Sequence, residues 1–262
     1  MWNYPAAPPI TNLPPQLWSL LPIVLLAATL LFLIAQSAQA EPQLRMATLE
    51  YPPYSSEHLP DGGSIVALTR RAFAVRGYQV QIDFLPWARV RVELGNGNYQ
   101  GALALWPKEV KEEGLQPSRP LFYSELGLFI RNDYPLQFSQ LQELRGKTLG
   151  IVRGYGYPQH IFDAGLTLEY AVDDISNLRK LNARRFDMVL LERIVGNHLI
   201  THDEQLRGKL SWHGNVLERI PLLVGFTPKR ADEPDWSAVF EQGLRDLHRS
   251  GEYMQILRSH NP

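Results

Sequence analysis

The sequence contains no cysteine among its 262 residues. That absence excludes disulfide bonds, thiolate zinc sites, iron–sulfur clusters and a cysteine nucleophile. The chain also lacks an excess of either charge, because 26 Lys and Arg residues stand against 27 Asp and Glu residues. Without a broad positive field to attract phosphate groups, we expect no nucleic-acid partner.

Motifs for cofactors and metals are equally scarce. Gly154-Tyr-Gly156 lacks the last glycine of a dinucleotide-binding loop and is not followed by Gly-Lys-Ser or Gly-Lys-Thr. His198 and His202 have the i, i+4 spacing of a metal-binding helix face, but a third ligand is not evident, which favours surface histidines. We therefore expect no metal and no cofactor.

The first 40 residues contain no Lys, Arg, Asp or Glu. Residues 17–35 form an apolar run of 19 residues, and Ala38 and Ala40 follow at the spacing that signal peptidase requires. The pattern predicts a signal peptide over 1–40 and a protein exported to the periplasm. A run of this length also just spans a bilayer, so an uncleaved N-terminal anchor in the inner membrane is the alternative.

The rest of the chain alternates between strand and helix patterns. Residues 44–49 and 78–84 have the character of strands, and 65–76 between them has apolar residues at helical spacing. This order predicts a right-handed βαβ unit. A second set follows, with strands expected at 148–152, 167–172 and 188–191 and helices at 141–144 and 175–183. The chain then ends with an extended stretch at 220–227 and helices at 236–249 and 253–257.

Two sets of this kind predict an α/β protein with two lobes. Extended apolar stretches at 128–131 and 222–227 would connect them. We assign 41–131 and 224–262 to the first lobe and 132–223 to the second. Because open α/β sheets bind ligands at the carboxyl ends of their strands, a cleft is expected where the two sheets face each other.

A series of short motifs runs through the body of the chain in a fixed order. They are Glu50-Tyr-Pro-Pro-Tyr54, Phe84-Leu-Pro-Trp-Ala-Arg89, Asn96-Gly-Asn-Tyr-Gln-Gly101, Ser118-Arg-Pro-Leu121, Leu144-Arg-Gly-Lys-Thr-Leu-Gly150, Phe186-Asp-Met-Val-Leu-Leu-Glu192 and Ser250-Gly-Glu-Tyr253. In this order the chain resembles the bacterial extracellular solute-binding proteins of family 3, the receptors of amino-acid ABC importers. The resemblance implies a type II periplasmic-binding-protein-like fold, with two Rossmann-like lobes joined by two crossover strands.

The resemblance also implies a function and partners. A small polar solute, an amino acid or a related amine or acid, would bridge the lobes and close the hinge, and the membrane subunits of an ABC transporter would recognise the closed form. We expect a monomer that is not an enzyme. Two alternatives stay open: a membrane-tethered sensory or accessory protein with the same lobes, and an enzyme such as a dehydratase that uses Glu192 as a general acid.

Site residues can be carried over one by one. Tyr51 falls on the aromatic residue that covers the ligand, with Tyr54 beside it. Glu192 follows Asp187 by five residues, at the position of the acidic partner for a ligand ammonium. Trp87 and Trp106 stand at the ends of predicted strands, where they either line the cleft or pack at the edge of the sheet.

The carboxylate clamp of the family is not retained. Lys108 and Lys111 stand where its Thr and Arg are expected, and a lysine does not supply the bidentate fork that matches a carboxylate. In the second lobe, Gly154 and Tyr155 open the segment where backbone N–H groups would hold an anion. These departures argue against a plain α-amino acid as the ligand.

Overall fold

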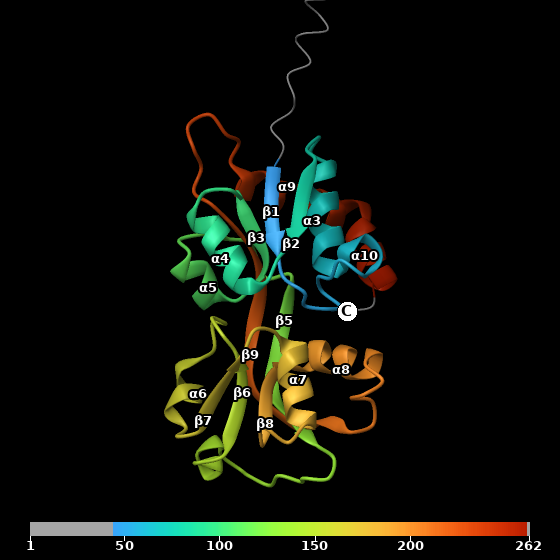
Figure 1. The fold of residues 1–262 in the computed structure, drawn as a ribbon. Coiled ribbons are helices and arrows are strands. Elements are labelled where there is room, and N and C mark those ends of the chain that lie inside the picture. Colours follow the sequence, from blue (N-terminus) through green and yellow to red (C-terminus); the bar gives the residue numbers. More distant parts are fainter. Residues whose placement is uncertain (1–43, 261–262) are drawn as a thin grey trace, which may run out of the picture. The chain divides into compact units, whose positions relative to one another are not determined.

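The computed structural model describes residues 44–260 (Figure 1). The signal peptide or anchor predicted over 1–40 lies outside these residues. Within them, no helix combines the length and the apolar character needed to cross a bilayer.

The first lobe is built on three parallel strands. They are β1 (Leu44–Thr48), β2 (Val80–Phe84) and β3 (Gly101–Leu105), with β1 paired to both of the others. Helix α3 (Ser64–Ala74) connects β1 to β2, and α4 (Trp87–Gly95) connects β2 to β3. The predicted βαβ unit is therefore confirmed.

Two C-terminal helices complete this lobe. Helix α9 (Trp236–Ser250) is capped by Asp235, whose carboxylate accepts a hydrogen bond from the Ala238 N–H, and by Gly251, which adopts a left-handed conformation. Its apolar face packs on α3, with the rings of Phe73 and Phe240 5.7 Å apart. Helix α10 (Glu252–His260) follows, and the short 3-10 helix η1 (Pro60–Gly62) precedes α3.

The second lobe repeats the scheme with another parallel set. Its strands are β6 (Thr148–Val152), β7 (Thr167–Ala171) and β8 (Met188–Glu192), and β6 pairs with both neighbours. Its helices are the 3-10 helix η2 (Leu141–Leu144), α6 (Gln159–Asp163), α7 (Asp174–Asn182) and α8 (Arg193–His202). All three strands and the helices predicted at 141–144 and 175–183 are present.

Strands β5 (Phe122–Arg131) and β9 (Leu210–Phe226) run antiparallel to each other and connect the lobes (Figure 1). The last residues of β9 pair with β3 and with the two-residue strand β4 (Gln116–Pro117), and the rest of β9 pairs with β5. The continuous strand order is β2-β1-β3-β9-β5-β8-β6-β7. Two lobes on shared strands confirm the predicted fold class, while the assignment of 41–131 and 224–262 to one lobe and 132–223 to the other stays a prediction.

Candidate functional site: an aromatic and acidic cavity between the lobes

The loops that follow the strands bring aromatic residues of both lobes together. Tyr51 follows β1, Trp106 follows β3, and Tyr155 follows β6. The ring of Tyr155 lies 6.4 Å from that of Tyr51 and 5.6 Å from that of Trp106, edge to face in both pairs. The carboxyl ends of strands in the two lobes therefore meet at one place, which is where open α/β sheets bind ligands.

These aromatic residues enclose a small cavity. It is lined by Leu49, Tyr51, Trp87, Ala104, Trp106, Glu109 and Tyr155. Its volume is about 10 Å³, which is roughly the space that one water molecule needs. A larger solute therefore enters only if the lobes separate or if Tyr155, the half-buried member of the set, swings away.

Hydrogen bonds connect the lobes on the side of α4 and α5 (Pro107–Glu112). The indole N–H of Trp87 donates to the carbonyl oxygen of Gly154 at 2.7 Å. The N–H of Gly156 donates to Oε1 of Glu109 at 2.9 Å, and the Lys108 ammonium donates to the carbonyl of Tyr157 at 3.3 Å. We call this set of contacts between Trp87, Lys108, Glu109 and the segment 154–157 the seam.

Glu109 is a buried residue of the site that the sequence analysis missed. Its Oε2 accepts the N–H of Trp106 at 2.8 Å, so the carboxylate caps α5 while it also holds Gly156 of the other lobe. Burial raises the pKa of Glu109 to about 7, although the two backbone N–H groups oppose the shift. The resemblance placed cations on this helix, but Lys111 is exposed and does not line the cavity.

Two more buried carboxylates lie on the second lobe. Glu192 caps α8, with Oε2 accepting the N–H of Val195 at 2.7 Å. Asp174, at the start of α7, accepts the Tyr155 hydroxyl on Oδ2 at 3.0 Å. Burial raises the pKa of each to about 7, and the nearby Glu192 charge contributes to the shift of Asp174.

Two buried polar atoms beside Tyr155 have no hydrogen-bond partner among residues 44–260. They are the hydroxyl oxygen of Tyr51 and Oδ1 of Asp174. Burial, together with the charges of Glu192 and Asp174, raises the pKa of Tyr51 well above its ordinary value, so its hydroxyl is neutral. A buried polar group without a hydrogen-bond partner destabilises the folded protein. These two atoms are therefore available to bond to a ligand.

Tyr54 supports the site from behind. It is buried, its ring stacks at 6.0 Å on Tyr51, and its other side contacts Phe122 at 5.0 Å. Burial and the charge of Glu192 raise its pKa. Of the residues predicted from sequence, Tyr51, Trp87, Trp106 and Tyr155 line the cavity.

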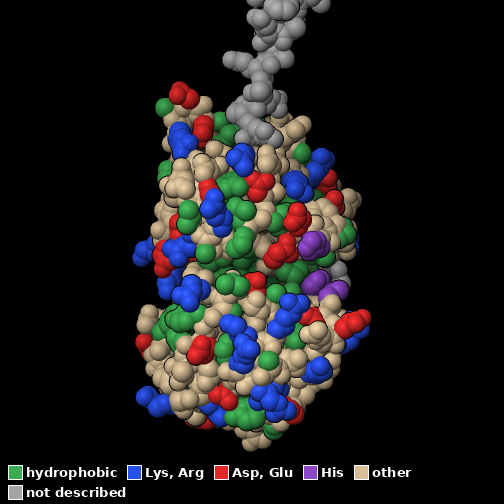
Figure 2. All heavy atoms as spheres, in the orientation of Figure 1, with side chains coloured by type: hydrophobic (Ala, Val, Ile, Leu, Met, Phe, Trp, Pro, Cys, Tyr) green, Lys and Arg blue, Asp and Glu red, His purple; other side chains and the backbone are tan. Residues whose placement is uncertain are grey.

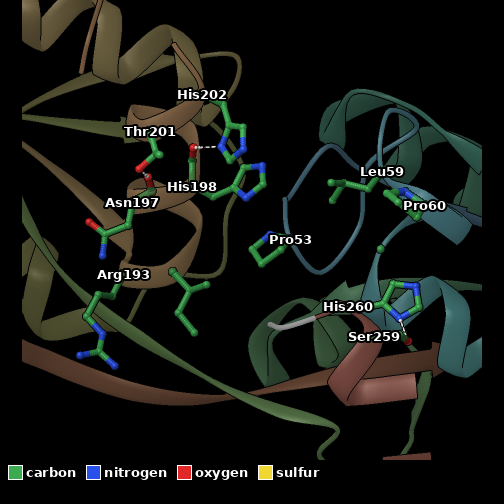
Figure 3. Close-up of a pocket in the computed structure, with 12 residues that line it drawn as sticks. Pro53, Leu59, Pro60, Arg193, Asn197, His198, Thr201, His202, Ser259 and His260 are labelled. Atoms are coloured by element: carbon green, nitrogen blue, oxygen red, sulfur yellow. Dashed lines mark hydrogen bonds between the residues drawn. The ribbon is translucent and has the colours of Figure 1, made fainter. Parts of the chain in front are cut away.

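The opposite side of the junction is an open groove. It comprises adjoining hollows of about 600 Å³ and about 890 Å³ between α8 and the segment 50–63. Histidines gather at this level of the surface (Figure 2), and the rings of His198 and His202 stack 4.0 Å apart on α8, across from Leu59, Pro60 and His260 (Figure 3). In the described part of the chain, no group of three side chains is arranged to hold a metal ion.

The architecture is that of the type II periplasmic binding proteins, and solved structures of that class resemble it over most of its length. A histidine kinase sensor domain with similarity to periplasmic binding proteins has a TM-score of 0.73 and 20% identity, covering 84% of this chain and 96% of that one.

An amino-acid ABC transporter substrate-binding protein from Streptococcus pneumoniae bound to L-arginine has a TM-score of 0.70 and 14% identity, covering 86% and 97% of the two chains. The GluR0 ligand-binding core from Nostoc punctiforme, solved with L-glutamate, has a TM-score of 0.68 and 17% identity, covering 82% and 98%. No protein-family model and no curated protein matches the sequence. These similarities establish the fold.

Proposed function

We propose that the protein is a periplasmic solute-binding protein that closes its two lobes on a small polar solute and presents the closed form to an ABC importer. The observation that carries the proposal is the cavity at the strand ends, whose lining comes from both lobes and combines aromatic side chains with the buried carboxylate of Glu109. The binding proteins among the structural neighbours support it by analogy of fold.

The hydrogen bonds of the seam would hold the two lobes in the closed arrangement. Each of its hydrogen bonds joins a residue of the first lobe to a residue of the second, so separating the lobes breaks all of them together. A solute that contacts Tyr51 on one side and Asp174 or Glu192 on the other stabilises only the closed arrangement, and this differential affinity shifts the population toward it.

Calorimetric titration of the purified protein with amino acids, amines and small carboxylates tests the proposal. We expect saturable binding of one solute per chain, loss of affinity in Tyr51→Ala, and unchanged affinity in Tyr123→Ala, an exposed tyrosine of β5. Binding should occur without turnover. Indifference to all three solute classes, or conversion of a bound solute to product that stops in Glu192→Gln, would contradict the proposal.

A second candidate function is a sensory protein that keeps its N-terminal segment as a membrane tether. The similarity to a histidine kinase sensor domain favours this candidate. N-terminal sequencing of the exported protein separates the two, because a mature chain beginning at Glu41 has lost the tether, whereas an intact N-terminus supports the sensor.

A further inference from the structure

The cavity lining contains one charged side chain, and that side chain is acidic. The lining includes Glu109 and contains no Lys or Arg among the residues that the structure describes. Asp174 touches the lining through the hydroxyl of Tyr155, and Glu192 lies close enough to raise the pKa values of both Tyr51 and Asp174. Above about pH 7, where these carboxyl groups are ionised, the cavity therefore repels an anion, including the carboxylate of an amino acid.

Two of the basic residues near this site are paired with acids, and Lys108 of the seam donates to the carbonyl of Tyr157 instead. Arg91 forms ion pairs with Glu112 and Glu113 on the side of α5. Arg193 pairs with Glu125 at 2.9 Å and remains partly exposed. Neither belongs to the cavity lining, so neither substitutes for the clamp that Lys108 and Lys111 were expected to form.

The two buried atoms without hydrogen-bond partners indicate which groups a ligand has to supply. Oδ1 of Asp174 accepts hydrogen bonds and carries part of a negative charge when ionised, and the hydroxyl oxygen of Tyr51 is also free to accept. A ligand that supplies several N–H donors and a positive charge satisfies both atoms. Tyr51, Trp87 and Trp106 also line the cavity, and the face of an aromatic ring attracts a cation.

We propose that the cleft takes a small organic amine or guanidine that has no carboxylate group, with its cationic end held between Asp174 and Tyr51. This inference rests on the proposed solute-binding function and names its substrate class. The cationic group bonds to the free Oδ1 of Asp174, and the cavity of about 10 Å³ admits the rest of the solute only when the ring of Tyr155 moves away.

Matched pairs of solutes test the absence of a carboxylate. Agmatine and arginine share a guanidinium group, and cadaverine and lysine share a terminal ammonium group, but only the second of each pair has a carboxylate. In calorimetric titrations at pH 7.5 we expect the decarboxylated member of at least one pair to bind about tenfold more tightly or better, since a buried like-charge contact costs at least about that factor.

Two variants locate the cation. Asp174→Asn should weaken binding of the amine about tenfold or more, because it removes the charge and keeps the shape. Asp163→Asn removes an exposed carboxylate of the same lobe and should leave the affinity unchanged. Circular dichroism and thermal unfolding of both variants verify that the fold is retained.

Other results would overturn the inference and separate it from the proposed function. Tighter binding of arginine or lysine than of the amines, or binding of small carboxylates alone, refutes the amine assignment and leaves solute binding intact. Full affinity in Asp174→Asn refutes the placement of the cation. Failure of every solute to bind refutes both proposals.

Discussion

The two sides of the junction between the lobes are built differently. On the seam side, Trp87 and Glu109 reach directly onto the backbone of Gly154 and Gly156 and leave room for about one water. On the groove side, α8 and the segment 50–63 border several hundred cubic ångströms of open space lined by exposed and half-buried histidines. In the proposed function, the seam holds the closed form together, whereas the groove is the side on which the lobes move apart.

Among the predictions, the largest expected change in the free energy of unfolding comes from pH. Glu109, Asp174 and Glu192 each have a folded-state pKa of about 7, above their ordinary values of 4.5 or 3.8. The folded protein therefore binds protons between about pH 4 and 7 that the unfolded chain does not bind. The resulting contribution to the free energy of unfolding is complete below about pH 4 and is lost as the pH rises through 7.

Urea unfolding at pH 5 and at pH 8 measures this pH-dependent part of the free energy of unfolding. We expect the free energy of unfolding to fall toward pH 8 by on the order of 2 kcal/mol or more in total. Glu109→Gln should flatten the decline, while Glu169→Gln, an exposed control, should not. A free energy of unfolding that rises over this range would contradict the burial of the three carboxylates.

Gly156→Ala should disrupt the seam through a steric clash with Glu109. A Cβ at this position lies 2.9 Å from Cγ of Glu109, and the neighbouring helix α5 has to move to admit it. We expect a loss of about 1–3 kcal/mol in the free energy of unfolding and weaker solute binding.

Gly95→Ala is the matched control, because a Cβ there meets no atom within 4 Å. Equal stability and affinity in both variants would show that the seam is not closely packed in solution.

Trp87→Phe should have a smaller effect. It removes the hydrogen bond to Gly154 and keeps most of the ring, and because Gly154 is exposed its carbonyl can accept from water instead. A loss of about 1 kcal/mol is expected in thermal or urea unfolding. Trp212→Phe, a substitution away from the seam, shows whether any change in solute affinity is specific to Trp87.

His202→Gln should have the smallest effect. The side chain is exposed on the groove side, where its ring stacks on His198. We expect a change within about 0.5 kcal/mol and unaltered solute affinity. An affinity loss larger than that of Trp87→Phe would reverse the ranking of the two sides.

The sequence predicts the fold well where apolar periodicity carries the signal. The strands at 148–152 and 188–191 and the helix at 236–249 appear within about two residues of their predicted bounds. The first half of β9 was missed because residues 210–219 are largely exposed or half-buried and polar. They are held by backbone pairing to β5 rather than by an apolar pattern.

The site was predicted less completely, for a physical reason. Tyr51, Trp87 and Trp106 could be placed because they follow strands, and strand ends converge. Glu109 and Asp174 lie at the starts of short helices, where acidic residues are ordinary and exposed in most proteins. Only tertiary burial distinguishes them. For Glu109, the sequence offers no capping-box signature, because Trp106 stands where that motif has Ser or Thr.

The most direct test of closure uses the absence of native cysteine. Spin labels on Val92→Cys and Val172→Cys, exposed positions on the two lobes, report the distance between them by pulsed electron resonance. A saturating solute is expected to narrow the distance distribution to one short value, and Gly156→Ala is expected to broaden it. A distribution that stays the same with and without a solute shown by calorimetry to bind would contradict closure of the lobes.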